Sequence, residues 1–263
     1  YWFIAKSQLD KGIDQWIAEQ RALGAEIEYS SKSLGGFPYR FELVVDHPVY
    51  AAPAAPRWEG EQLRLVMQPW NWQHVIAYSP GRNVLTEADG LRQTLTLDKS
   101  SAVSVSWNSD TFRRIGVQMG SATALIEGES YEAANFSLNL APRNGAETDL
   151  MIALQWDRLT INGAPEGAEF LGDTLGPSRL IGEVREFFPA WVRSGGNPER
   201  LHRALIQQDG GVEIAQGLLN WGPLDLGVKG DLAYEDGAAN GSMGVRIDNA
   251  DALRDALESS GRL

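Results

Sequence analysis

The sequence contains no cysteine and only three histidines. The absence of cysteine excludes disulfides, thiolate metal ligands and cysteine nucleophiles, and leaves the cellular compartment open. His47, His74 and His202 are scattered, so no pair stands at the spacing of a zinc site. The chain also lacks a Gly-x-Ser-x-Gly nucleophile elbow, a phosphate-binding loop and a dinucleotide fingerprint. We therefore expect a protein that is not an enzyme and has no cofactor.

Basic charge is also scarce. The chain carries 23 Lys and Arg against 35 Asp and Glu, which gives a formal net charge of -12. Proteins that bind nucleic acid neutralise phosphates with clustered Lys and Arg, and no basic stripe occurs here, so we expect no nucleic-acid partner. The same charge disfavours attraction of the chain as a whole to an anionic membrane surface, unless an anchor overrides it.

No apolar run is long enough to cross a bilayer, although the first residues are aromatic and apolar. Tyr1-Trp2-Phe3-Ile4-Ala5 has the character of a membrane-interface belt, whereas a spanning helix needs about 20 residues. We expect a signal anchor immediately before residue 1. The alternative is that these residues simply pack on the folded body.

A helix is expected over residues 1–24. Apolar residues recur near helical spacing and predict one packed face: Leu9, Ile13, Trp16, Ile17 and Leu23. Charged residues occupy the remaining positions, and Gly24 supplies a stop. We expect the face that contains Trp16 to lie on a sheet.

The segment Gly36-Phe37-Pro38-Tyr39-Arg40 is expected to form a rigid, extended corner between that helix and a first strand over residues 41–45. In an extended segment Phe37 and Tyr39 point the same way. We interpret the corner as a structural pivot. If the Phe37 ring is buried in the core, its truncation to alanine should cost about 3–5 kcal/mol.

Strand patterns follow. Leu63, Leu65 and Met67 alternate with polar residues after a proline-rich segment, which predicts a strand. Residues 68–74 then concentrate aromatic and polar residues without a clear period. That segment either caps one end of a sheet core or lines a mouth with amphipathic rings.

The most regular pattern lies between Leu91 and Ile161, where apolar residues stand two apart in consecutive sets. Polar turn signals, such as Asn108-Ser109-Asp110 and Gly120-Ser121, separate the sets. This pattern predicts an antiparallel meander of roughly seven strands with one apolar and one polar face. The central question is what covers the apolar face.

Two helices are expected near residues 174–209. Leu180, Val184, Phe187, Phe188 and Trp191 carry the helical period of the first, and Asn197-Pro198 is a cap that opens the second. Strand patterns resume after Gly210-Gly211, and a last helix follows Asp248 or Asn249 and stops at Gly261.

The expected fold is therefore α+β, a long curved and mainly antiparallel sheet or incomplete barrel. We expect one elongated domain over residues 1–263. Its sections are a helix at 1–24, a first β section at 37–165, a helical segment at 174–209, and a second β section with a terminal helix at 211–263.

The nine tryptophans allow a sugar-binding hypothesis, because aromatic rings can stack on pyranose faces. Four of them continue the inward pattern of their neighbours, which favours core packing: Trp16, Trp107, Trp156 and Trp191. Another four tryptophans follow no clear period: Trp58, Trp70, Trp72 and Trp221. Together with Phe37 and Tyr39 of the corner, they are the candidate ligand-binding residues of a groove or mouth.

Three stretches carry a family resemblance: the helix residues 16–24, the corner 36–40, and the segment 210–232 with its Trp221-Gly222-Pro223-Leu224. With them the chain resembles an uncharacterised, membrane-anchored family of alphaproteobacterial envelope proteins, distantly similar to AsmA-like proteins. The resemblance covers most of the chain. It implies an inner-membrane anchor, a periplasmic body and a curved sheet whose concave apolar face holds or guides lipid, and it supplies no catalytic residues.

Physical reasoning leaves three classes of function open. Many amphipathic strands with few covering helices leave apolar area that either a closed fold or a lipid acyl chain could bury. A lipid-binding envelope protein is the expected function. The alternatives are a structural or scaffolding envelope protein, and a module that binds a protein or glycan through its aromatic loops.

Overall fold

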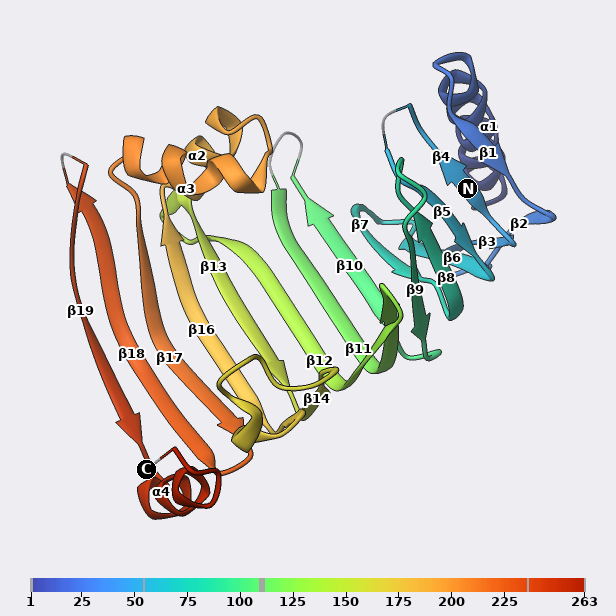
Figure 1. Ribbon diagram of the computed structural model, residues 1–263. Coiled ribbons are helices and arrows are strands. Elements are labelled where there is room, and N and C mark those ends of the chain that lie inside the picture. Colours follow the sequence, from blue (N-terminus) through green and yellow to red (C-terminus); the bar gives the residue numbers. More distant parts are fainter. Residues whose placement is uncertain (1, 54, 109–111, 236, 263) are drawn as a thin grey trace. The chain divides into compact units, whose positions relative to one another are not determined.

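In the computed structural model, residues 2–53, 55–108, 112–235 and 237–262 are described. They form a mainly antiparallel sheet structure with an N-terminal helix and helices inserted between later strands (Figure 1). The expected α+β class is thereby confirmed. Tyr1 of the interfacial run, and Ser109 and Asp110 of an expected turn, lie outside the described residues.

The chain divides into two compact units. The first comprises residues 1–111 and 117–133, and the second comprises residues 112–116 and 134–263. The single elongated domain stays a prediction.

The first unit is a meander of five chain segments, each of which is bent near its middle and so contributes two strands. In chain order, the five segments contain the strands β1 (Glu26–Glu28) and β2 (Ser31–Gly35); β3 (Phe41–Asp46) and β4 (Val49–Ala51); β5 (Arg57–Gly60) and β6 (Gln62–Gln68); β7 (Asn71–Tyr78) and β8 (Gly81–Thr86); and β9 (Arg92–Leu97) and β10 (Ala102–Trp107).

Successive segments of this meander pair antiparallel along both of their halves. One half contains the pairings β2–β3, β3–β6, β6–β7 and β7–β10, and the other contains β1–β4, β4–β5, β5–β8 and β8–β9. Strand β11 (Phe112–Ile126) extends the second half by pairing Ala122 to Leu125 with β9. The five bends therefore lie in a row across the sheet.

Polar side chains stabilise this row of bends, because a bend weakens the regular ladder and its polar groups still need partners. Asp46 accepts hydrogen bonds from Ser31 Oγ (2.6 Å) and Gln62 Nε2 (2.9 Å), and these bonds lower the pKa of its carboxyl group. The buried Asn83 donates to the Ser79 and Gly81 carbonyl groups.

The bend between β9 and β10 is organised by Asp98. Its carboxylate accepts hydrogen bonds from Ser101 Oγ (2.6 Å), Ser100 Oγ (2.8 Å) and the Ser121 backbone N–H (3.1 Å). The bond from the Ser101 hydroxyl is the main cause that lowers the Asp98 pKa, and burial opposes it. The ionised form of Asp98 is therefore the form that the fold selects.

The expected extended corner at residues 36–40 was wrong. Residues 37–39 form a turn that joins β2 to β3, with a cis peptide bond between Phe37 and Pro38. Strands β1 and β2 precede this turn and went unpredicted, because Glu26–Glu28 and Ser31–Gly35 have almost no apolar alternation. The segment 68–74, in which no clear period was found, contains the end of β6 at Gln68, a short turn and the start of β7 at Asn71.

The second unit is built on neighbouring antiparallel strands: β12 (Glu129–Arg143) from Ala134 onward, β13 (Ala146–Trp156), β16 (Ser178–Arg185), β17 (Gly211–Trp221), β18 (Leu224–Glu235) and β19 (Ala238–Ile247). The short elements β14 (Arg158–Thr160), η1 (Glu169–Leu171) and β15 (Thr174–Leu175) lie between β13 and β16 in sequence. No turn interrupts β11 at Gly120-Ser121, contrary to expectation.

Helices lie at the two ends of the strands in the second unit. Helices α2 (Phe187–Arg193) and α3 (Pro198–Gln207) lie at one end, and α4 (Ala250–Ser259) lies at the other (Figure 1). Ala190, Ala204 and Leu205 form a small buried core between α2 and α3. Within the described part of this unit the helices leave apolar side chains of β19 exposed, among them Met243 and Val245.

The expected helix over Leu180 and Val184 is strand β16 instead. These residues pair with Leu154 and Leu150 of β13. A spacing of four residues fits both a helical turn and two strand repeats. The long antiparallel pairing with β13 stabilises the strand.

Truncation of Phe41 should destabilise the first unit far more than truncation of Phe37. Phe41 is 1% exposed and its ring stacks on Trp2 at 5.5 Å, whereas Phe37 is 62% exposed. We expect Phe41→Ala to lower the free energy of unfolding by about 3–5 kcal/mol, and Phe37→Ala by less than about 1.5 kcal/mol. Urea unfolding followed by circular dichroism measures both, and equal losses would contradict this assignment of the core.

Asp98→Asn should lower stability in a pH-dependent way. The folded-state pKa of Asp98 is depressed, so its contribution is present above the ordinary aspartate pKa and is lost as the pH falls through the folded value. We expect a loss of about 1 kcal/mol near neutral pH that shrinks toward zero as the pH falls below the ordinary aspartate pKa and through the lowered pKa of the folded state. Urea titrations of both proteins at several pH values test this, and a constant difference would refute it.

A candidate ligand groove

An apolar groove lies in the first unit where α1 (Trp2–Ala22) covers the first three segments of the meander. Its volume is about 560 Å³. It is lined by Ile13, Trp16, Ile17, Ile27, Glu28, Tyr29, Lys32, Leu43, Val45, Pro48, Val49, Tyr50, Trp58, Leu63 and Leu65. The helix forms one wall, and strands from both sides of the row of bends form the others.

Strand alternation and the bends place these side chains. In the β3–β6 ladder Leu43 pairs with Leu65 and Val45 pairs with Leu63, so the four aliphatic side chains share one face. Beyond the bends, Val49 and Tyr50 of β4 and Trp58 of β5 also line the groove. The bend therefore turns one face of the sheet into two walls.

The helix contributes Ile13, Trp16 and Ile17, the middle of its expected packing face. Ile17 is buried, but Trp16, which was expected in the core, is 49% exposed. The reason is that its indole forms part of the groove wall and is covered only on part of its surface. One face of α1 thus both packs on the sheet and lines the groove.

An ion-pair cluster ties α1 to the sheet beside the groove. The ammonium group of Lys32 on β2 contacts Asp10 Oδ1 at 3.1 Å and also the Asp14 carboxylate, both on α1. Burial is the largest influence on the Lys32 pKa and lowers it, but the hydrogen bonds from its ammonium group to Asp14 and Asp10 together raise it above the ordinary value. Lys32 is therefore charged, neutralised by these partners, and only 14% exposed at its side chain.

Trp58 is the one sequence-predicted site residue that lines this groove. Its indole N–H donates to Asn83 Oδ1 at 3.2 Å, which fixes the ring against the row of bends. Sequence reasoning missed the aliphatic lining residues as a site. Their alternation at Leu43, Val45, Leu63 and Leu65 was the available signal, but alternation by itself indicates only an inward face.

Four other predicted residues, Phe37, Tyr39, Trp70 and Trp72, lie at one end of the first unit. Together with Trp2, Phe3 and Phe41 they form what we call the aromatic cluster. Ring centroids lie 5.3 Å apart for Trp2 and Phe37, and 5.4 Å apart for Phe41 and Trp72. Phe37, Tyr39, Trp70 and Trp72 are exposed.

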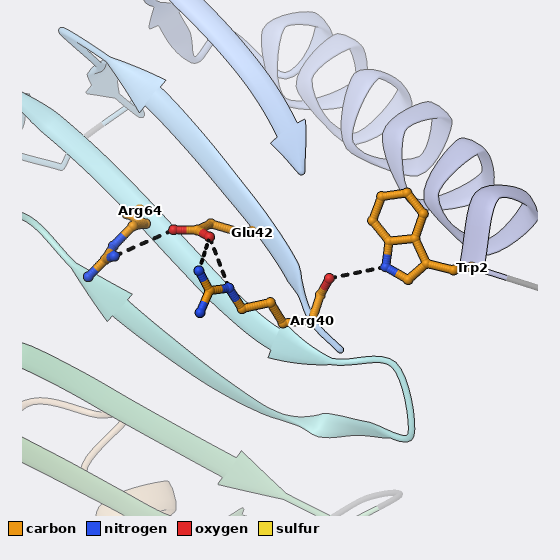
Figure 2. A network of polar contacts seen from close by, with 4 residues as sticks. All are labelled: Trp2, Arg40, Glu42 and Arg64. Carbon is orange, nitrogen blue, oxygen red and sulfur yellow. Dashed lines mark hydrogen bonds and ion pairs between the residues drawn. The ribbon is translucent and has the colours of Figure 1, made fainter. Parts of the chain in front are cut away.

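Polar contacts fix the base of the aromatic cluster. The Trp2 indole N–H donates to the Arg40 carbonyl at 3.1 Å, which joins α1 to the β2–β3 turn (Figure 2). The Arg40 guanidinium pairs with Glu42 at 2.8 Å, and Arg64 approaches the other Glu42 oxygen at 3.4 Å (Figure 2).

Trp221, the remaining predicted residue, lies in the second unit at the end of β17. Its indole N–H donates to the Gly172 carbonyl at 2.9 Å and thereby holds the loop that follows η1. The six predicted residues therefore do not form one mouth, because they belong to the groove, the aromatic cluster and the second unit separately.

The three histidines each contact a hydroxyl group: His47 contacts Ser30, His74 contacts Ser104, and His202 contacts Tyr234. Across the part of the chain that the structure describes, no three His, Asp or Glu side chains are grouped so as to hold a metal ion. Among the described helices, none combines the length and apolarity needed to cross a membrane.

A family model described as "Uncharacterized protein conserved in bacteria (DUF2125)" matches residues 2–263. The chain belongs to the DUF2125 family. Comparisons of this DUF2125 chain with curated proteins and with solved structures found no match.

Loss of both helix carboxylates should loosen α1. In the double variant Asp10→Asn/Asp14→Asn the poorly exposed Lys32 ammonium loses its ionised partners, which we expect to cost about 1–3 kcal/mol. Lys32→Met should cost less than about 1.5 kcal/mol, because the two freed aspartates are exposed and the methionine adds to an apolar wall. Hydrogen exchange across α1 and urea unfolding compare the variants, and a larger effect of Lys32→Met would contradict the cluster's role.

Proposed function

We propose that this DUF2125 chain is a non-enzymatic protein that binds the acyl chain of a lipid in the groove beneath α1. The observation that carries the proposal is the lining: the groove walls are aliphatic and aromatic, and its two charged lining residues are an exposed glutamate and a neutralised lysine. Such a surface offers shape complementarity and dispersion contacts to an apolar ligand, and it offers few hydrogen-bond partners.

The size of the groove fits this class of ligand. Its volume of about 560 Å³ lies within the range of roughly 300–1,000 Å³ that is common for small-molecule sites. Each methylene group moved from water into such a site contributes about 0.8 kcal/mol, so several methylene groups supply the binding energy of a lipid tail. No charged partner is needed for that part of the ligand.

The charge arrangement favours a neutral buried segment. Lys32 is already paired with Asp10 and Asp14, so an anionic headgroup at that position would have to displace two intramolecular carboxylates. A glycan fits less well, because its hydroxyl groups need hydrogen-bond partners that an aliphatic wall does not provide. The headgroup of a bound lipid is therefore expected outside the apolar part of the groove.

A periplasmic location with an N-terminal inner-membrane anchor, and a distant relation to AsmA-like proteins, belong to this proposal. They agree with a lipid-binding role, since a periplasmic body held near the inner membrane would have lipid within reach. A scaffolding role, or a protein- or glycan-binding role of the aromatic loops, is the competing class of function.

Lipid identification with a charge-matched pair of variants tests the proposal. Ile13→Asp introduces a carboxylate into the groove wall, whereas Leu23→Asp adds the same charge at an exposed position that does not line the groove. We expect native mass spectrometry of the wild type and Leu23→Asp, after incubation with extracted membrane lipids, to show stoichiometric lipid. Ile13→Asp should retain less than about a tenth as much, because a charge in an apolar site is strongly unfavourable.

Circular dichroism of both variants controls for folding. A wild type that stays free of lipid after this incubation would overturn the proposal and favour scaffolding. Equal lipid retention by folded Ile13→Asp would also refute it, because the lipid would then lie outside the groove.

A further inference from the structure

Large aromatic side chains are exposed together at one end of the first unit. Tyr39 is 74% exposed, Phe3 70%, Trp70 66% and Phe37 62%. All four side chains therefore present most of their surface to solvent. Exposed apolar area of this kind, when it is contiguous, marks an interaction site.

Three chain segments bring these rings to the same end. Glu42 pairs with Gly35 and Phe41 pairs with Met67, so the β2–β3 turn and the β6–β7 turn lie at the same end of the strands. The start of α1 joins them through the contacts of Trp2 with Phe37 and Phe41, at centroid distances of 5.3 and 5.5 Å. The exposed rings therefore stand on two turns and one helix end.

The rings rest on an ordered base. Phe41 is fully buried beneath Trp2 and Trp72, and the Trp2 N–H is bonded to the Arg40 carbonyl (Figure 2). Tight packing below the turns limits the number of conformations of the exposed side chains before binding. They therefore lose less conformational entropy on binding, which lowers the cost of an interaction.

The charge of this end differs from that of the whole chain. Residues 2–9, 33–41 and 64–78 contain Lys6, Arg40 and Arg64 and no aspartate or glutamate, although the net charge of the chain is -12. The nearest carboxylate along β3, Glu42, is paired with both Arg40 and Arg64. The aromatic cluster thus stands in a locally basic region.

We propose that the aromatic cluster is a docking surface for the interface of an anionic lipid bilayer. Tryptophan and tyrosine prefer the level of lipid headgroups, where the ring is apolar and its polar atom remains hydrated. Basic side chains beside them add attraction to anionic lipids. The overall charge disfavours attraction of the chain as a whole to such membranes, whereas the local composition of this end favours it.

The occupant is assigned to a bilayer and not to a protein because the rings are carried by turns and a helix end, and because the segments that carry them, residues 2–9, 33–41 and 64–78, contain cations and no aspartate or glutamate. Docking by this surface is independent of whether the groove holds an acyl chain. The two proposals can therefore fail separately.

Vesicle flotation of the chain tests the docking surface. We expect the wild type to float with vesicles of equal parts phosphatidylcholine and phosphatidylglycerol, and Phe37→Ser/Trp70→Ser to bind about tenfold more weakly. The matched control Val103→Ser/Leu125→Ser removes exposed apolar side chains of the same unit outside the cluster, and it should bind as the wild type does. Ile13→Asp should also float normally, and Phe37→Ser/Trp70→Ser should retain the lipid of the groove.

A second measurement avoids any dependence on folding of the double variant. Brominated acyl chains in these vesicles should quench the tryptophan fluorescence of the wild type, and Trp70→Phe should lose a clear part of that quenching while it keeps an aromatic ring. Wild type that does not float, flotation unchanged in the folded double variant, or no quenching would each overturn the proposal. Self-association that is lost in the double variant, without vesicle binding, would assign the surface to a protein contact and would also overturn it.

Discussion

Backbone pairing that continues through a row of bends is the constraint on which the first unit depends. His47 N–H donates to the Glu61 carbonyl and Glu61 N–H donates to the Arg82 carbonyl, so neighbouring segments remain connected where they change direction. Side chains such as Asp46, Asn83 and Asp98 satisfy the polar groups that the bends expose. Because each segment bends near its middle, the apolar face of one sheet becomes two walls that α1 can close into a groove.

The position of α1 follows from two kinds of contact. Near its start, Trp2 packs on Phe41 and donates to the Arg40 carbonyl, and further along the helix Asp10 and Asp14 hold Lys32. These contacts keep Ile13 and Trp16 against the groove instead of in a fully closed core. A helix attached in this way leaves apolar volume beneath it, and that volume is the basis of the proposed acyl-chain site. The same helix start contributes to the aromatic cluster, which makes α1 common to both proposed lipid contacts.

The sequence predicted elements well where one period was strong and long. The first helix, the strand with Leu63 and Leu65, and the cap at Asn197-Pro198 have counterparts in the structure, whereas Trp16 and Leu23 of the expected packing face are exposed. It failed where polar residues form strands, as in Ser31–Gly35, because such strands are held by their neighbours' backbone groups. It also failed at Leu180 and Val184, whose spacing fits two periods.

The sequence by itself determined the mainly antiparallel α+β class, the acidic charge and the absence of cysteine chemistry, because alternation and composition are local properties. Only the tertiary structure decided which rings come together. Trp58 faces the groove, Trp70 and Trp72 lie at an exposed end with Phe37, and Trp221 supports a loop elsewhere. Strand register and the row of bends set these positions, and both depend on hydrogen bonds between segments far apart in the chain.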